Sequence, residues 1–415
     1  MELPVETIEC RTSWVVVAAS LTILTIAFGA PMVAVVALKS IAAGLDLPRS
    51  VPALAGSAAY MGSGLGGILM GWVADRVGAR RTAAFGLVMI ALGLQVSASG
   101  SAAALLLGHG VLVGFLGLGC LFAPLVTLVS RWFDRRRGTA LALVASGQYT
   151  AGVLWPALLT WSIARFGWQT TMMAYGILAV ACTLPLCLLL RQPPAQSAAA
   201  IARGPQAGAR VLGWPGWVVQ AGIAAAIFLC CIPMAMPQGH LVALCSDLGF
   251  APAQGAVMLS VMLGVAFAGR QFWGWLADRI GGLPTVIAGS AMQAAGILGF
   301  MLTQDEAGLF LASAVFGVGF SGLVPAYILA LRDLFPDREA AWRVPVVLLA
   351  GQGGMAVGSW MAGAIYDAAG FYAPAFGLGL AFNLLNLVLV GVLAARQSSR
   401  RSDHPSDRLG RLAGA

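Results

Sequence analysis

The sequence predicts an all-α membrane protein with twelve transmembrane helices in two pseudo-symmetric halves of six. Composition is the first reason: 59% of the 415 residues are apolar, 10% are charged, and the mean hydropathy is +0.87. Soluble domains carry roughly 25% charged residues. The second reason is the length of the uncharged runs, which at twenty or more residues suffice for a helix to cross a ~30 Å hydrocarbon core. A repeated loop, described below, is the third. A water-soluble protein is therefore excluded.

Twelve apolar runs lie between breaks made of Gly, Pro and charged residues. They cover residues 14–38, 52–73, 82–99, 103–130, 139–161, 168–190, 216–243, 253–276, 285–303, 307–331, 343–365 and 372–394. The longest polar interruption, 191–216, is rich in Pro, Gly and Ala and has no apolar period, which indicates a linker. We expect an N-terminal bundle at 1–190, a cytoplasmic linker at 191–216, a C-terminal bundle at 217–395 and a cytoplasmic tail at 396–415.

The placement of the cations predicts the orientation. The chain has 23 Arg and one Lys, and twenty of these fall on the side of the N-terminus when twelve spans are counted. Only Lys39, Arg49 and Arg165 fall on the other side, so the positive-inside rule predicts that both termini are cytoplasmic. We expect a multi-pass protein of a bacterial inner membrane, monomeric, with the lipid bilayer as its surroundings. Arginine clusters between spans indicate topology and do not indicate a nucleic-acid partner.

No cofactor, metal or catalytic residue is predicted. The seven Cys lie mostly within apolar stretches without metal or disulfide spacing, and the three His are scattered. A membrane enzyme would need a nucleophile with its base, or a metal cluster. The protein is therefore not expected to be an enzyme.

One loop occurs twice. GWVADRVGA (71–79) returns as GWLADRIGG (274–282), identical at six of nine positions and at the same point of each half, which indicates a duplicated six-helix unit. Asp75 can accept from helix N-termini or from Arg groups of the adjacent bundle and so hold a gate shut. The alternative is a generic Arg-rich loop. The predicted gating motif comprises Gly71, Asp75, Arg76, Gly78, Arg80, Arg81, Gly274, Asp278 and Arg279.

With this motif the chain resembles the major facilitator superfamily along essentially its whole length. Three stretches resemble the monocarboxylate transporter branch and its bacterial relatives, with the oxalate/formate exchangers close by: ALKSIAAGLDLPRS (37–50), RWFDRRRGTALALVASGQYTAG (131–152) and HLVALCSDLGFAPAQGAVML (240–259). The resemblance implies a transporter of small carboxylates. Animal members of the branch place an Asp one turn before the Arg of the eighth helix, where this chain has Ala266.

Arg270 is the one cation well inside a span, about 12 Å along the helix from Asp278. A charged group at such depth is functional by default. No Asp or Glu lies inside any predicted span, so a bound carboxylate, held by the planar guanidinium fork, is the expected partner. The alternative is bonding to unwound backbone carbonyls or helix C-termini.

Three further ionisable residues are candidates. Lys39 lies at the outer end of the first span, where a snorkelling cation is the alternative; the resemblance implies a contact with the substrate anion. His240 and His109 are candidates for proton coupling because imidazole titrates near neutral pH. For both, a structural hydrogen bond is the alternative.

Five uncharged polar side chains complete the predicted substrate site: Tyr60, Gln148, Tyr149, Tyr327 and Gln352. Each has a structural helix–helix bond as its alternative. The expected function is secondary active transport of small organic anions, with monocarboxylates as the expected class, by alternating access with proton symport or anion exchange. An efflux antiporter for drugs or other small molecules, and a channel or uniporter, remain as alternatives.

Overall fold

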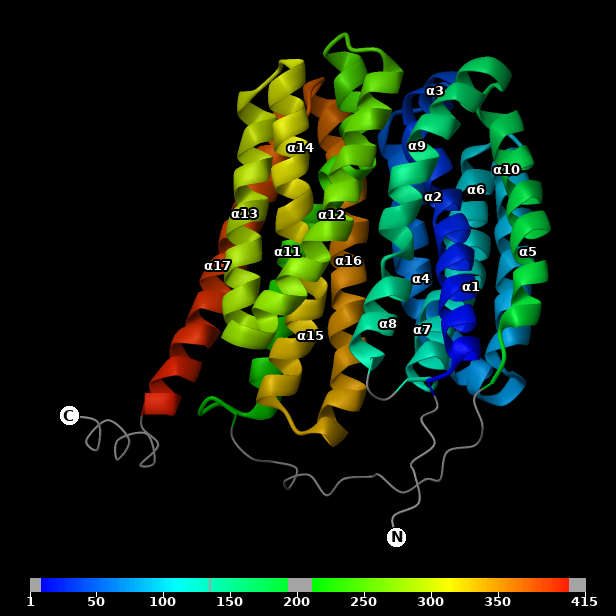
Figure 1. Ribbon diagram of the computed structural model, residues 1–415. Coiled ribbons are helices and arrows are strands. Elements are labelled where there is room, and N and C mark those ends of the chain that lie inside the picture. The colour runs from blue at the N-terminus through cyan, green and yellow to red at the C-terminus, as the bar shows by residue number, and fades with distance from the viewer. Residues whose placement is uncertain (1–8, 134–135, 193–210, 403–415) are drawn as a thin grey trace.

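The computed structural model describes residues 9–133, 136–192 and 211–402, and it is built almost wholly of helices (Figure 1). The N-terminal half contains α1 (Arg11–Ala27), α2 (Gly29–Val36), α3 (Leu38–Gly44), α4 (Ser50–Val77), α5 (Ala79–Ser97), α6 (Ala102–Leu106), η1 (Leu107–Gly117), η2 (Leu118–Cys120), α7 (Phe122–Ser130), α8 (Arg137–Ala145), α9 (Gly147–Phe166), α10 (Trp168–Thr183) and η3 (Pro185–Leu189). The C-terminal half contains α11 (Gly216–Asp247), α12 (Pro252–Ile280), α13 (Gly282–Leu302), α14 (Glu306–Ser321), α15 (Leu323–Leu334), α16 (Asp337–Ala369) and α17 (Ala373–Ser402).

The twelve predicted spans correspond to these helices. Eleven described segments are long and apolar enough to cross a membrane. The remaining crossing is made by α8 and α9, which follow one another along the N-terminal bundle and are divided at Ser146 (Figure 1). We call the end at which α1 begins and α17 ends the terminal end, and the opposite end the distal end.

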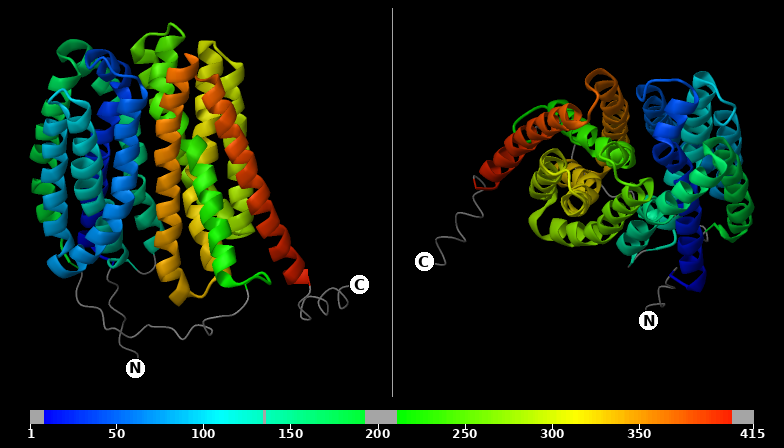
Figure 2. Two further views of the ribbon diagram at one scale, coloured as in Figure 1. Left: turned by 180° about the vertical axis from the view of Figure 1, so that it is seen from behind. Right: turned by 90° about the horizontal axis from the view of Figure 1, so that it is seen from above.

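Each half packs around its own core, and Figure 2 shows the two bundles side by side. One cluster of buried apolar residues lies entirely within the N-terminal half. The other lies in the C-terminal half and takes in three residues of the N-terminal half, Leu38, Ala53 and Tyr149. Along the boundary α4 packs against α16, and α9 packs against α12.

Close helix packing depends on glycine. A Cβ on Gly62 of α4 would lie 2.3 Å from the Gly110 carbonyl of η1, and one on Gly358 of α16 would lie 2.0 Å from the Ile232 carbonyl of α11. Only a residue without a side chain allows backbones this close in a membrane protein, where small residues replace the hydrophobic effect as the source of tight helix contact.

Two predicted boundaries can be compared with the helices. The predicted tail begins at 396, but α17 continues to Ser402. Most of the predicted linker, residues 193–210, and the rest of the tail, residues 403–415, lie outside the described residues. The division into two bundles with the linker between them therefore stays a prediction at its exact limits.

Candidate functional site

Arg270 lies on α12, half-buried at the boundary between the bundles, and it bonds to both of them. Its Nη1 donates to the Ala145 carbonyl at 3.0 Å, its Nη2 to the Tyr149 hydroxyl at 2.9 Å, and its Nε to the Ser321 carbonyl at 3.3 Å. The guanidinium also stacks over the Tyr149 ring at 4.4 Å. The structure thus shows the arrangement given above as the alternative for this residue: an arginine bonded to backbone carbonyls at helix ends.

Both carbonyls are available because a helix is interrupted at each of them. Ala145 ends α8, and the Tyr149 N–H that would reach its carbonyl in a continuous helix donates to Ser146 instead. Ser321 ends α14, one residue before Gly322, where a Cβ would lie 2.2 Å from Trp273. A carbonyl left unpaired at a helix end needs another donor, and the guanidinium serves both.

The charge of Arg270 remains uncompensated within the described residues. None of the ion pairs found there involves Arg270, and its three partners are neutral. A guanidinium has five N–H donors, so one N–H on each terminal nitrogen remains for a ligand. The arrangement fits a bound carboxylate, which would supply both the missing charge and two acceptors.

Three of the five predicted polar side chains, Tyr149, Tyr60 and Gln352, lie at this boundary. A fourth, Gln148, is next to Tyr149 in the chain. Tyr149 is 2% exposed, and its hydroxyl also lies 3.3 Å from the Ser321 carbonyl. Tyr60 packs against the core of the opposite half. The Gln352 amide donates to Ser63 across the boundary at 3.3 Å. Gln148, beside Tyr149, is half-buried, and its amide makes no hydrogen bond with another described residue.

Tyr327 lies elsewhere, in a polar cluster inside the C-terminal bundle. Its hydroxyl donates to Asn386 at 2.5 Å, and the Asn386 amide donates to Ser290 at 2.9 Å. This cluster joins α13, α15 and α17. The bonds are those of the helix–helix alternative stated for Tyr327.

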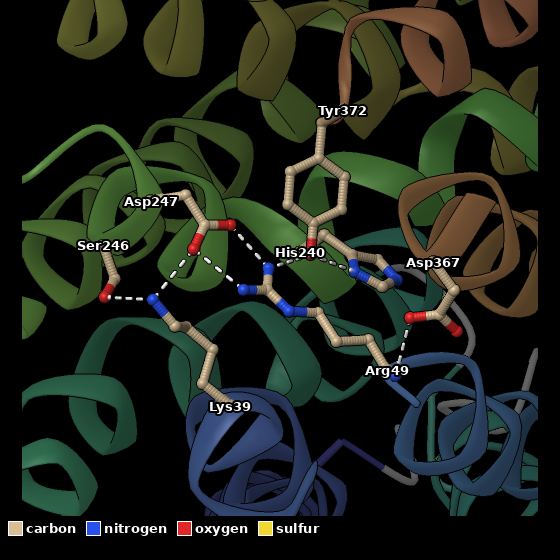
Figure 3. Close-up of polar contacts among 7 residues, drawn as sticks. All are labelled: Lys39, Arg49, His240, Ser246, Asp247, Asp367 and Tyr372. Carbon is tan, nitrogen blue, oxygen red and sulfur yellow. Dashed lines mark hydrogen bonds and ion pairs between the residues drawn. The ribbon is translucent and has the colours of Figure 1, made fainter. Parts of the chain in front are cut away.

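A cluster of charged residues joins the two halves at the distal end, and we call it the distal clasp: Lys39, Arg49, Asp247 and Asp367 (Figure 3). Arg49 holds Asp247 with both terminal nitrogens, at 2.5 and 2.8 Å, and Lys39 reaches the same carboxylate at 2.8 Å. Lys39 also donates to Ser246 at 2.8 Å. The predicted anion contact Lys39 is thus paired with an acid of the opposite half in this conformation.

Asp367 strengthens the clasp by capping a helix of the other half. Its two carboxylate oxygens accept from the backbone N–H groups of Arg49 and Ser50 at 2.8 Å each, at the start of α4. A carboxylate there satisfies N–H groups that have no partner within the helix and lies at the positive end of the helix dipole. The first turn of α4 is therefore fixed to α16.

Arg49 stays charged within the clasp. Burial acts to lower the pKa of Arg49, but its hydrogen bonds with Asp247 and Tyr372 outweigh burial and raise the pKa above its usual value. The guanidinium also stacks over Tyr366 at 3.7 Å. Burial raises the pKa of the neighbouring Tyr372 above its usual value, so that hydroxyl keeps its proton.

The two candidate histidines are both fully buried and have different surroundings. His240, on α11, lies 3.2 Å through Nδ1 from the Tyr372 hydroxyl and 2.9 Å through Nε2 from the Ser359 carbonyl. His109, in the π-helical segment η1, bonds through Nδ1 to Ser97 at 2.8 Å, while its Nε2 has no partner in the described part of the chain. Only His240 is joined to the distal clasp.

The repeated loop has the same conformation in both halves. Gly78 and Gly281 connect consecutive helices with φ of +95° and +85°, values that glycine adopts without strain. Arg76 stacks over Trp72 at 3.5 Å and Arg279 over Trp275 at 3.8 Å. A Cβ on Gly71 or Gly274 would meet open space, so neither glycine makes a close backbone contact in this conformation.

Asp75 pairs with Arg131 at 2.7 Å, and both belong to the N-terminal half. In this conformation Asp75 therefore bonds within its own half among the described residues. The gating role predicted for it concerns the state in which the terminal end is shut. Both side chains are more than half exposed, so the pair contributes little to folding, about 0–1 kcal/mol.

Comparison with known proteins identifies the family. The sequence model of the Major Facilitator Superfamily matches residues 17–239 and, separately, residues 221–412. The chain belongs to the Major Facilitator Superfamily. Each match spans roughly one half, as the repeated loop predicts for a duplicated unit.

The similar superfamily proteins include transporters of several kinds. The "MFS-type transporter pynF" of Aspergillus niger is 27% identical over 73% of this chain and 69% of its own length. "Monocarboxylate transporter 13" of Bos taurus is 26% identical over 75% of this chain and 73% of its own, which supports the predicted resemblance to that branch. The crystal structure of a D-xylose–proton symporter superposes with a TM-score of 0.72 at 15% identity, covering 91% of this chain and 96% of the other.

Sequence patterns predict little of the distal clasp in this superfamily member. Arg49 contributes only to the predicted topology, and no motif singles out Asp247, Asp367 or Tyr372. One signal is present: only three cations are predicted at that end, and the acids Asp247 and Asp367 follow the seventh and eleventh spans. Asp247 lies 198 residues from Arg49, however, and no local pattern pairs them.

We expect Asp75→Asn to lower turnover while leaving expression largely intact. If Asp75 contacts the opposite bundle when the terminal end closes, its loss destabilises that state, and a shift of about 1–3 kcal/mol inverts a balanced equilibrium. The measurement is the labelling of a cysteine introduced at Thr139, exposed near the start of α8. Asp305→Asn, an exposed helix cap at the distal end, is the control. Unchanged transport and labelling would contradict the gate.

Proposed function

We propose that this transporter carries small organic anions, with monocarboxylates as the class, by alternating access of the two bundles around Arg270. The observation that carries the proposal is the uncompensated guanidinium of Arg270 at the boundary, with neutral partners drawn from both halves. An isolated cation is costly inside a membrane protein unless an anion accompanies it during part of the cycle. Tyr60, Tyr149, Gln148 and Gln352 are the expected uncharged contacts for the rest of the solute.

The proposed orientation places the terminal end in the cytoplasm, following the positive-inside rule. The distal clasp then closes the outer end, and the structure corresponds to an inward-facing state. When the clasp opens, Lys39 and Arg49 lose Asp247 and become available to attract an incoming anion, which reconciles the implied role of Lys39 with its present ion pair. Similarity to monocarboxylate transporters supports the substrate class.

An efflux role for larger organic molecules is the second candidate. It is favoured by a segment of 126 residues that is 30% identical to the "Fujikurins efflux protein" of Gibberella fujikuroi. Transport assays in vesicles of known orientation distinguish the two candidates, because short acids would not be moved by a carrier selective for larger molecules.

The proposed substrate class is tested by comparing short carboxylic acids with their methyl esters in a thermal-shift assay on the purified protein. Binding to the folded state alone stabilises it by about 2.7 kcal/mol at a concentration one hundred times Kd. We expect a responsive acid to raise the unfolding temperature and its ester to have little effect, because the ester lacks the charge. Equal shifts for acid and ester would reject the anion.

A further inference from the structure

A continuous chain of hydrogen bonds joins the buried imidazole of His240 to the distal clasp (Figure 3). Arg49 lies 3.1 Å through Nη1 from the Tyr372 hydroxyl, which lies 3.2 Å from His240 Nδ1. His240 Nε2 lies 2.9 Å from the Ser359 carbonyl. Arg49 belongs to the N-terminal half and the other three residues to the C-terminal half, so the chain crosses the boundary.

The direction of each bond in this chain is fixed by its two ends. A guanidinium can only donate, so the Tyr372 oxygen accepts from Arg49. A carbonyl can only accept, so His240 Nε2 carries a proton and donates to Ser359. The Tyr372 hydroxyl has one proton of its own, and the described residues offer it no acceptor other than Nδ1. Every group in the chain therefore has a partner only when Nδ1 carries no proton. The closed clasp therefore contains neutral His240, with its proton on Nε2.

We infer that His240 controls the distal clasp: the clasp closes when His240 is neutral and opens when it is protonated. With a proton on Nδ1, the Tyr372 oxygen would have to accept from both Arg49 and the ring, and its own O–H would turn away and lose its acceptor. The added proton would also place a second positive charge beside Arg49. His240 thereby acts as a positioning residue for the conformational change, through Tyr372 and Arg49.

The acids of the cluster offset this effect only in part in the closed state. Burial and the charge of Arg49 disfavour a protonated imidazole, whereas Asp367 of α16 favours it; both oxygens of Asp367 are bonded to the start of α4. Asp247 of α11 is held by Arg49 and by Lys39 of α3. Tyr366 of α16 lies under the Arg49 guanidinium.

When the distal end opens, His240 Nδ1 no longer has to be unprotonated. Arg49 moves away with the N-terminal half, and Tyr372 is free to rotate and accept from a protonated ring. The open state can therefore bind one more proton than the closed state, so linkage requires that acid shift the equilibrium toward the open state. The inference rests on the alternating access proposed above but is independent of the substrate.

The test measures the accessibility of the distal boundary as a function of pH, without substrate. Leu38, on α3, is 3% exposed and packs in the core of the opposite half, so Leu38→Cys reports separation of the halves. The exposed native Cys10 and Cys182 are replaced by Ser in the full-length protein. Labelling by a membrane-impermeant maleimide is divided by that of a cysteine at exposed Gln304, which corrects for the pH dependence of thiol reactivity.

We expect the normalised labelling rate of Leu38→Cys to rise about tenfold between about pH 8 and about pH 5, over the range in which imidazole titrates. His240→Gln, which cannot be protonated, and Tyr372→Phe, which interrupts the chain, are each expected to abolish the pH dependence. His109→Gln is the matched control: it removes an equally buried histidine that is not joined to the clasp, and it should keep the full effect.

Labelling of Leu38→Cys that does not change with pH would overturn the inference, as would a pH dependence that survives in His240→Gln or Tyr372→Phe, or one that disappears in His109→Gln. The Tyr372→Phe measurement stands by itself if His240→Gln fails to fold. Because no solute is present, a negative result in the acid–ester comparison would leave this outcome unaffected.

Discussion

Arg270→Gln is expected to abolish carboxylate uptake, and Arg270→Lys is expected to lose most of the affinity although it keeps the charge. Lysine cannot present the planar fork that holds a carboxylate with two bonds. Its single nitrogen also cannot replace the three separate nitrogens with which Arg270 reaches Ser321, Ala145 and Tyr149. Loss of a charged, bidentate contact costs about 2–3 kcal/mol, or roughly a hundredfold in affinity. The measurement is binding and uptake of a responsive acid and its methyl ester by wild type and both variants.

Two controls separate binding from structure at Arg270. Tyr149→Phe removes one partner of the guanidinium without changing the charge, so it should reduce affinity less than Arg270→Lys and retain the preference for acid over ester. Arg343→Gln removes another buried arginine, whose partners Glu339 and Gln220 lie within the C-terminal half, and should also retain that preference. Full transport by Arg270→Gln would show that Arg270 only bridges the bundles, and the substrate class would have to be reconsidered.

Asp247→Asn is expected to open the distal end. It leaves Arg49 and Lys39 without their shared carboxylate, and loss of hydrogen bonds between charged groups in such a partly exposed cluster costs about 1.5–3 kcal/mol. Conformational states of one protein differ by a few kcal/mol, so a penalty confined to the closed state is enough to reverse their populations. The expected result is faster labelling of Leu38→Cys at neutral pH and a lower turnover, because the inward-facing state is rarely reached.

The two cations of the clasp should differ in importance. The Arg49 side chain is 13% exposed and binds Asp247 with two nitrogens, whereas Lys39 is 39% exposed and binds with one. Arg49→Gln should therefore open the distal end nearly as far as Asp247→Asn. Lys39→Gln should have a milder effect, mainly raising the half-saturation concentration, since an outer cation attracts the anion. Restored closure in the charge-swapped pair Arg49→Asp with Asp247→Arg would confirm the contact, and unchanged labelling in Asp247→Asn would contradict the clasp.

The general architecture was accessible from sequence because its signals are local. A hydrophobic run long enough to cross a bilayer predicts a spanning helix wherever it occurs. The loops at 71–79 and 274–282 indicate a duplicated unit without knowledge of any contact. The isolation of Arg270 was also visible, since no predicted span contained an acid that could pair with it.

The partners of the charged residues depended on tertiary structure. Arg270 bonds to Ala145 and Ser321, whose carbonyls are free only because the fifth and tenth spans are each divided into two helices, α8 and α9 or α14 and α15. Continuous apolar runs do not reveal such breaks, because apolarity reports burial in lipid or protein and carries no information on backbone hydrogen bonds.

The sequence by itself determined the membrane class, the number of spans, the duplication and the one arginine inside a span, all of which follow from residues close together in the chain. Only the tertiary structure decided that Lys39 and Arg49 share Asp247, that Asp367 caps α4, and that His240 joins this cluster through Tyr372. These bonds link residues 132 to 318 positions apart. They exist because two separately packed bundles meet at the distal end, and no pattern within the sequence of either half specifies how the other half is placed.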